Sequence, residues 1–419
     1  MLFRDIKASR PRPKSVSSHM AGLSGVIMLA INVAIARNIG AIAASMGFEG
    51  VPERADGPYA ALLSVFLCAL PMVGWSLFVD KVHRRESTGI DWSLKRPITE
   101  TLDISIVKLA GFWCTWLLIA FVYSVFRFYW EAPYTFAMEV FLFFVVPLVA
   151  LSIPYAIWVD RHMVEPKKDA VWHFGAMIAG RGDFDFAQVK HHLRNWAVKG
   201  FFCAFMVSIL PGGWSEAVNA DLSQVIGNPV YFAGLMIGTL FLIDVQIATV
   251  GYLLTMKPLD SHIRSANPFM QGWVAALLCY PPFVIMNENA TIDYHFGAAD
   301  WAYWMQDHTL LLMFWAGLLV WLTGIYAWAT VAFGLRFSNL TYRGVITHGP
   351  YAWTKHPAYL SKNAFWWCVT LPFLVTSGDV TEAVRNTAMI CLVSAIYYWR
   401  ARTEEAHLRA EDPAYVEYE

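Results

Sequence analysis

Charged residues in this chain cluster between long apolar runs, and about ten of these runs are long enough to cross a bilayer. A bilayer core about 30 Å thick needs roughly 20 apolar residues in helical conformation. The predicted spans lie near residues 22–44, 59–79, 107–129, 136–159, 196–214, 230–255, 270–286, 310–333, 358–375 and 383–399. The fifth, seventh and ninth are weaker because they contain Gly or Pro, which membrane helices tolerate. The expected fold class is an all-α polytopic transmembrane bundle.

The distribution of charge predicts the orientation of this bundle. Lys and Arg collect in cytoplasmic loops of membrane proteins. They are concentrated here in the loops after the second, fourth, sixth and eighth predicted spans, whereas the alternate loops carry acidic residues. The N-terminal tail is also basic, with Arg4, Lys7, Arg10, Arg12 and Lys14. Ten spans reproduce this alternation, so both termini are expected in the cytoplasm.

Composition supports a membrane protein and excludes some other classes. The chain of 419 residues is 57% hydrophobic and only 15% charged, whereas a soluble domain carries about 25% charged residues. The formal net charge of −1 gives no basic character of the kind that nucleic-acid binding requires. His191 and His192 with Asp183 and Asp185 match no standard metal-site spacing, and no metal site is expected.

The last third of the chain contains a polar, turn-forming stretch, residues 343–359, which leads directly into the ninth predicted span. Gly349-Pro350 is a turn signal, and Pro357 suits the first turn of a helix. Backbone N–H groups therefore meet at a helix N-terminus near the cytoplasmic interface. Such a position can receive a carboxylate or another anionic group.

A second polar group follows the tenth predicted span. On a continuing helix, Arg400 and Glu404 stand at positions i and i+4 on one face, and Glu405 points elsewhere. Paired acids beside arginines at a membrane boundary could hold a cationic and an anionic ligand group side by side. The alternative is an ordinary solvated helix end with surface ion pairs, and spacing alone does not separate the two.

Together these stretches resemble the C-terminal signature of the isoprenylcysteine carboxyl methyltransferase family, within the membrane phospholipid and isoprenylcysteine methyltransferase superfamily. That signature runs approximately G-x-Y-x-x-x-R-H-P-x-Y, then a membrane hairpin, then R-x-x-x-E-E. The matching pieces here are Gly349, Tyr351, Lys355-His356-Pro357-Ala358-Tyr359, Arg400 and Glu404-Glu405. The resemblance covers roughly residues 331–419, and residues 1–330 have no counterpart in the smaller methyltransferases.

The resemblance implies an integral membrane methyltransferase that uses S-adenosylmethionine. Its acceptor would be a lipid or lipid-modified group from the bilayer, and its active site would face the cytoplasm. Arg400 would orient the acceptor, and Glu404 would act with it in catalysis. The implied cofactor-binding residues are Arg343, Gly344, Val345, Ile346, Tyr351, His356, Pro357, Ala358, Tyr359, Glu404 and Glu405. Lys355 stands where the family usually has arginine and lacks a planar fork for a bidentate contact, and Ser361 replaces a common glycine.

Two other functions remain open from the sequence. Sterol reductases have a similar C-terminal architecture and a comparable number of spans, but they bind NADPH. A non-enzymatic lipid transporter or scaffold would instead depend on Asp244, because an acid inside a membrane span is usually paired, protonated or directed at a cavity.

Overall fold

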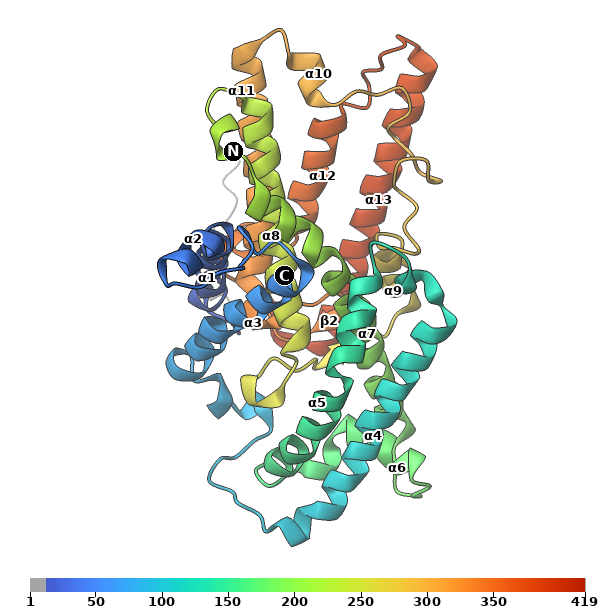
Figure 1. Ribbon diagram of the computed structural model, residues 1–419. Coiled ribbons are helices and arrows are strands. Elements are labelled where there is room, and N and C mark those ends of the chain that lie inside the picture. Colours follow the sequence, from blue (N-terminus) through green and yellow to red (C-terminus); the bar gives the residue numbers. More distant parts are fainter. Residues whose placement is uncertain (1–12, 419) are drawn as a thin grey trace, which may run out of the picture.

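The computed structural model describes residues 13–418, whose regular secondary structure is helical apart from one short two-stranded ladder and an isolated bridge (Figure 1). Arg4, Lys7, Arg10 and Arg12 of the basic tail, together with Glu419, lie outside the described residues. The described part therefore confirms the all-α class.

Seven helices of the described chain are long and apolar enough to cross a membrane, as expected of a multi-pass membrane protein. They are α1 (His19–Arg37), α3 (Pro58–Gly74) with its π-helical extension η1 (Trp75–Val79), α4 (Ile98–Val125), α5 (Thr135–Asp160), α7 (Phe186–Asn219), α8 (Pro229–Leu253) and α11 (Thr309–Phe333) with the short helix η8 (Gly334–Arg336). Each overlaps one of the ten spans expected from the sequence.

The other three expected spans have different structures. In place of 270–286 there is the short helix α9 (Met270–Leu277), followed by irregular chain that contains the Pro281-Pro282 pair. The expected span 358–375 is α12 (Pro357–Thr370), which has only 14 residues and ends just before Pro372. The expected span 383–399 lies inside α13 (Val380–Glu411), which is long enough but not apolar enough to match the other seven.

The remaining elements are short and connect these helices. They are α2 (Ile39–Ser45), η2 (Val82–Arg84), η3 (Glu86–Thr88), η4 (Arg127–Trp130), η5 (Pro166–Lys168), α6 (Ala170–Ile178), η6 (Leu222–Gln224), η7 (Lys257–Leu259), β1 (Ser265–Ala266), α10 (Trp301–Met305), β2 (Thr341–Tyr342), η9 (Gly349–Ala352) and α14 (Pro413–Tyr418). The antiparallel pairing of β1 with β2 places Ser265 opposite Tyr342. This ladder joins the loop after α8 to the loop that enters the C-terminal helices.

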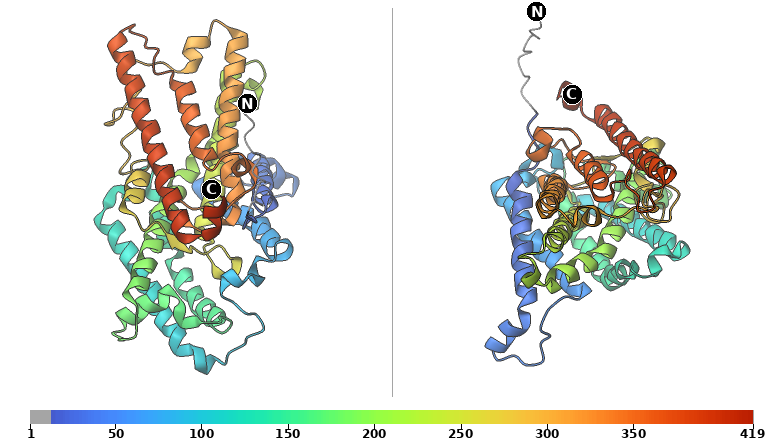
Figure 2. Two further views of the ribbon diagram at one scale, coloured as in Figure 1. Left: turned by 180° about the vertical axis from the view of Figure 1, so that it is seen from behind. Right: turned by 90° about the horizontal axis from the view of Figure 1, so that it is seen from above.

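The helices form two groups that meet in the middle of the molecule. Helices α11, α12 and α13 run side by side toward one end, whereas α4, α5 and α6 lie toward the other (Figures 1 and 2). Helix α8 packs against both α7 and α11 and so connects the groups. The close contact of α1 with α11 depends on Gly22, because a Cβ at this position would lie 2.0 Å from the carbonyl oxygen of Val331.

Arg37 is a charged residue inside the first expected span, 22–44, and the structure explains its position. Helix α1 ends at Arg37, and the Arg37 guanidinium donates hydrogen bonds to the carbonyl oxygens of Ala217, Val218 and Ala220 at 2.8–3.0 Å. These carbonyls belong to the end of α7, where the last turn has no intrahelical partners. Arg37 therefore stabilises the contact between α1 and α7.

Candidate functional site

The loop that contains residues 343–348 is held in place from one side by the N-terminal segment 13–18. The Val16 N–H donates to the Val345 carbonyl at 3.2 Å, and the Thr347 hydroxyl donates to the Pro13 carbonyl at 3.0 Å. Gly344 adopts φ +103°, and a Cβ there would lie 2.6 Å from Val16 Cγ1. A glycine is required at position 344 by both its backbone conformation and this close contact.

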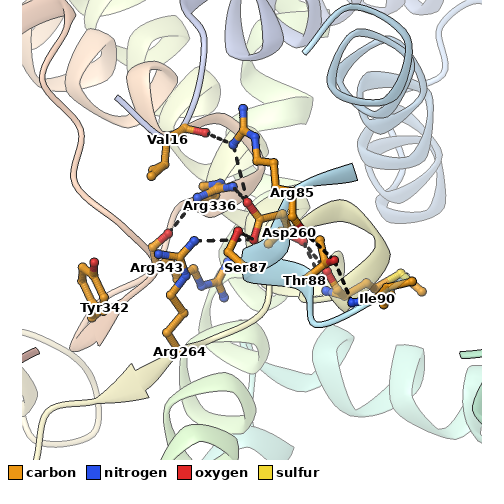
Figure 3. Close-up of polar contacts among 12 residues, drawn as sticks. Val16, Arg85, Ser87, Thr88, Ile90, Asp260, Arg264, Arg336, Tyr342 and Arg343 are labelled. Carbon is orange, nitrogen blue, oxygen red and sulfur yellow. Dashed lines mark hydrogen bonds and ion pairs between the residues drawn. The ribbon is translucent and has the colours of Figure 1, made fainter. Parts of the chain in front are cut away.

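A buried carboxylate, Asp260, holds the same loop from the other side (Figure 3). It accepts hydrogen bonds from Arg336 and from the Ser87 hydroxyl, and Arg85 and Arg264 each lie 3.5 Å away. Burial alone would raise the pKa of Asp260, but the cation of Arg336, the Ser87 hydroxyl and Arg264 together hold it below its usual value. The second arm of Arg336 donates to the Arg343 carbonyl at 2.9 Å, so the network fixes the backbone where the candidate site begins.

The Arg343 side chain is almost fully buried, with 3% of its surface exposed. Its Nη1 donates to the carbonyl oxygens of Gly251 and Leu335, at 3.0 and 3.3 Å. Its Nε and Nη2 are buried and have no hydrogen-bond partner among the described residues. Burial away from a carboxylate lowers the pKa of Arg343, and an anionic ligand placed there would restore the charge balance.

Helices α12 and α13 bring the two sequence motifs together. The Tyr359 hydroxyl donates to Oε1 of Glu404, and Arg400 Nε lies 3.5 Å from the same carboxylate oxygen. The Arg400 guanidinium is buried between two aromatic rings, 5.0 Å from the ring centre of Tyr359 and 5.4 Å from that of Tyr280. Its Nη2 donates to Asn339 Oδ1 at 2.6 Å. The Arg400–Glu404 pair is therefore part of a buried network, and the solvated helix end considered above is wrong.

These residues line a cavity of about 440 Å³. Most of the candidate residues named from the sequence contribute to its wall: Arg343, Gly344, Val345, Ile346, Tyr351, His356, Ala358, Tyr359, Arg400 and Glu404. The structure thus brings together residues that are far apart in the chain, such as Asn339 and Arg400, which are 61 positions apart. The volume falls within the range of roughly 300–1,000 Å³ that small-molecule sites occupy.

Two of the named candidates, Pro357 and Glu405, are not in the wall of this cavity. Pro357 is buried in the first turn of α12. Glu405 points to another face of α13, where it lies 3.1 Å from His356 Nε2, 2.8 Å from Arg402 and 3.2 Å from Arg409. Glu405 therefore belongs to an ion-pair cluster outside the cavity wall. This cluster holds His356, which is part of the wall.

Part of the cavity wall is apolar and comes from α7 and α8, two of the helices that can cross a membrane. This part includes Phe205, Met206, Ile209, Phe241 and Val245. Asp244 also lies there and accepts hydrogen bonds from Thr330 and, at 2.8 Å, from the Tyr326 hydroxyl. The Lys362 ammonium lies 5.0 Å from the ring centre of Tyr326. Asp244 is therefore hydrogen-bonded to two residues of the neighbouring helix α11 and also contributes to the cavity wall.

Several residues of the site were missed by sequence reasoning. Tyr280, Tyr326, Asn339, Lys362 and Tyr397 line the cavity, and two of them come from residues 1–330. Aromatic residues are common in membrane segments, so Tyr280 gives no local signal. Lys362 is the exception, because a lysine five residues inside a predicted span is costly unless it faces a cavity.

The described residues contain no group of three or more His, Cys, Asp or Glu side chains that could hold a metal ion. Comparison with known proteins finds no matching family model, and neither a curated protein nor a solved structure shows significant similarity to this chain. The functional conclusion therefore depends on the chemistry of the cavity.

Proposed function

We propose that this protein is an integral membrane methyltransferase that uses S-adenosylmethionine and acts on a lipid or lipid-modified acceptor. One observation carries the proposal. The two C-terminal motifs, which resemble those of the isoprenylcysteine methyltransferase family, line one cavity through residues such as Tyr351, His356, Arg400 and Glu404.

The residues present fit the functional groups of this cofactor. S-adenosylmethionine carries an ammonium, a carboxylate and a sulfonium, and when bound it supplies an electrophilic methyl group. Glu404 offers a carboxylate to the ammonium, and the unpartnered atoms of Arg343 suit a carboxylate. The tyrosine rings in the wall offer faces to a cationic sulfur.

The work of the protein in such a transfer is mainly alignment and exclusion of water. Arg400 is buried and held by Asn339 and Glu404, so it can orient a polar acceptor group with little rearrangement. Tyr359 fixes the Glu404 carboxylate from the neighbouring helix. The apolar part of the cavity wall suits the hydrocarbon part of a lipid acceptor, which would enter between helices.

The proposal includes the orientation expected from the charge of the loops, with both termini and the cofactor entrance on the cytoplasmic side and about ten membrane segments. Under this arrangement α12 and α13 form the membrane hairpin of the resemblance. Residues 331–419 would supply the cofactor motifs, and Asp244 and Tyr280 of the preceding region would complete the wall.

The test is calorimetric titration of the detergent-purified protein with S-adenosylhomocysteine, with NADPH in parallel. Micromolar binding of S-adenosylhomocysteine is expected, and Glu404→Gln should abolish it. Glu411→Gln is the matched control, because Glu411 lies on the same helix but outside the cavity wall. Loss in Glu404→Gln alone would justify a search for the acceptor by transfer of a labelled methyl group to membrane lipids.

Other outcomes would change the assignment. Binding of NADPH alone would move the protein to a reductase of the sterol-reductase type. Binding of neither ligand by a folded protein would contradict both enzymatic readings and would favour a lipid transporter or scaffold.

A further inference from the structure

A second cavity, of about 370 Å³, lies among α4, α5, α6 and α7 and is closed on one side by the segment 255–264. It shares no wall residue with the candidate methyltransferase cavity. None of the residues singled out by the C-terminal motifs contributes to it. Its chemistry therefore has to be explained separately.

The wall of this second cavity is basic. It contains five cationic side chains, Lys108, Lys168, Lys199, Lys257 and Arg264, and two carboxylates, Asp160 and Asp169. Both carboxylates are already engaged. Lys108 Nζ lies 2.5 Å from Asp160 and 3.3 Å from Asp169, and Lys257 Nζ lies 3.0 Å from Asp169. Of the other cations, Lys168 pairs with Glu165 and Arg264 with Asp260, which leaves Lys199 without a carboxylate among the described residues.

Lys199 is the clearest unbalanced cation. It projects from α7, is partly buried, and forms no ion pair with a carboxylate in the described part of the chain. Its ammonium lies 4.9 Å from the ring centre of Trp196, one turn earlier on the helix. A lysine in this position on a membrane-type helix is expected to bind an anion or to reach water.

Histidines beside Lys199 add donors to the same wall. His191 Nε2 lies 2.8 Å from the Arg264 carbonyl oxygen and must donate to it, because a carbonyl only accepts. His191 Nδ1 and His262 Nδ1 are buried and have no hydrogen-bond partner among the described residues. An imidazole nitrogen that carries a hydrogen donates to an anion. Asn195 Oδ1 is also buried and unpartnered, and it suits a hydroxyl or amine beside that anion.

We propose that this cavity binds a phosphate group that carries a polar substituent, of the kind found in a phospholipid headgroup or a free phosphate ester. A phosphate is small, doubly or singly charged, and accepts several hydrogen bonds, so it matches the Lys199 ammonium and the two imidazoles. The aromatic residues Phe112 and Trp196 in the wall sit on helices that can cross a membrane, which favours the lipid source. The inference does not rest on the proposed function.

The test uses delipidated, detergent-purified protein and two probes: short-chain phosphatidylglycerol and glycerol 1-phosphate. Binding is measured by calorimetry, and lipid retention by native mass spectrometry. We expect Lys199→Gln to weaken binding by about tenfold or more, as for the loss of one charge-assisted hydrogen bond. Lys199→Arg should retain most of it. Lys190→Gln is the matched control, because Lys190 lies on the same helix, is exposed and is not in the wall.

The outcomes separate the two sources and can overturn the inference. Binding of the lipid alone assigns a headgroup site, and binding of glycerol 1-phosphate assigns a site for a free ester. Failure of both probes to bind, or an equal loss in Lys190→Gln, overturns it. If Lys199→Gln folds poorly, the wild-type protein alone can test the inference by chemical acetylation. Bound probe must then protect Lys199, but not Lys190, from acetylation.

Discussion

The Tyr359 hydroxyl donates a hydrogen bond to the Glu404 carboxylate, and this contact ties the first turn of α12 to α13. The same carboxylate lies 3.5 Å from Arg400. A hydrogen bond to a charged acceptor contributes more than one between neutral groups. The position of Glu404 in the cavity wall therefore depends on Tyr359 as well as on Arg400.

Tyr359→Phe should weaken S-adenosylhomocysteine binding by about tenfold, because the Glu404 carboxylate loses the donor that fixes it. Calorimetric titration measures the change. Tyr398→Phe is the matched control, since Tyr398 is on α13 but 68% exposed. Unchanged affinity in Tyr359→Phe would show that Glu404 is positioned without this hydrogen bond.

Gly344→Ala should release the N-terminal segment from the loop that it covers. The new Cβ would lie 2.6 Å from Val16 Cγ1, and φ +103° is strained for any L side chain at a cost of about 1–3 kcal/mol. Trypsin should then cleave faster after Lys14, which mass spectrometry of the fragments detects. Gly47→Ala is the control, because Gly47 has φ +81° with open space around it. Equal cleavage rates in wild type and Gly344→Ala would contradict the close contact.

The long apolar helices could be predicted from sequence because length and hydropathy are local properties of the chain. The expected spans 270–286 and 358–375 are longer than the helices found there, because each contains proline. Helix α12 ends at Thr370, and the following Leu371 takes a left-handed conformation directly before Pro372. The residue before a proline is disfavoured in the α conformation. The end of α12 near Thr370 could therefore be predicted from the sequence.

The candidate site was only partly predictable, since part of its wall comes from distant segments. His356, Arg400 and Glu404 lie in recognisable motifs and meet in one cavity. Asp260 gave no such signal, although it binds Arg336 and so holds the Arg343 backbone. Its role depends on a loop between α8 and β1 that folds against a loop more than 70 residues later, and no local pattern encodes that contact.

Lys108→Met should destabilise the protein strongly. Lys108 is buried and lies 2.5 Å from Asp160, which is itself 1% exposed. Removal of the lysine leaves a buried carboxylate without its cation, which costs about 3–5 kcal/mol. We expect the apparent melting temperature to fall by at least about 5 °C.

Two further variants test this explanation. Lys168→Met should leave the melting temperature unchanged, because the Lys168 side chain is 79% exposed and surface ion pairs contribute little. The double variant Lys108→Met/Asp160→Asn should recover much of the lost stability. If it is as unstable as Lys108→Met, loss of packing rather than of charge pairing is responsible.

His262 should make the protein less stable as the pH falls from about 6.5 to about 4. Burial, with the nearby cation of Lys257, lowers the pKa of His262 from its usual 6.5 to about 4, although Asp260 acts in the opposite direction. In this window the unfolded chain binds a proton that the folded protein does not, so stability rises with pH. Arg264 and Arg336 add to the positive charge that faces the ring.

His262→Gln should reduce this dependence by the contribution of His262, because glutamine does not titrate. The measurement is the apparent melting temperature at pH 6.5, 5.5 and 4.5 in a buffer without phosphate, since an anion in the second cavity would raise the pKa of His262. His173→Gln is the control, because His173 lies outside this cavity wall. If wild type and His262→Gln lose stability in parallel as the pH falls, His262 is already protonated in the folded protein, and the positive field around it must be weaker than the structure implies.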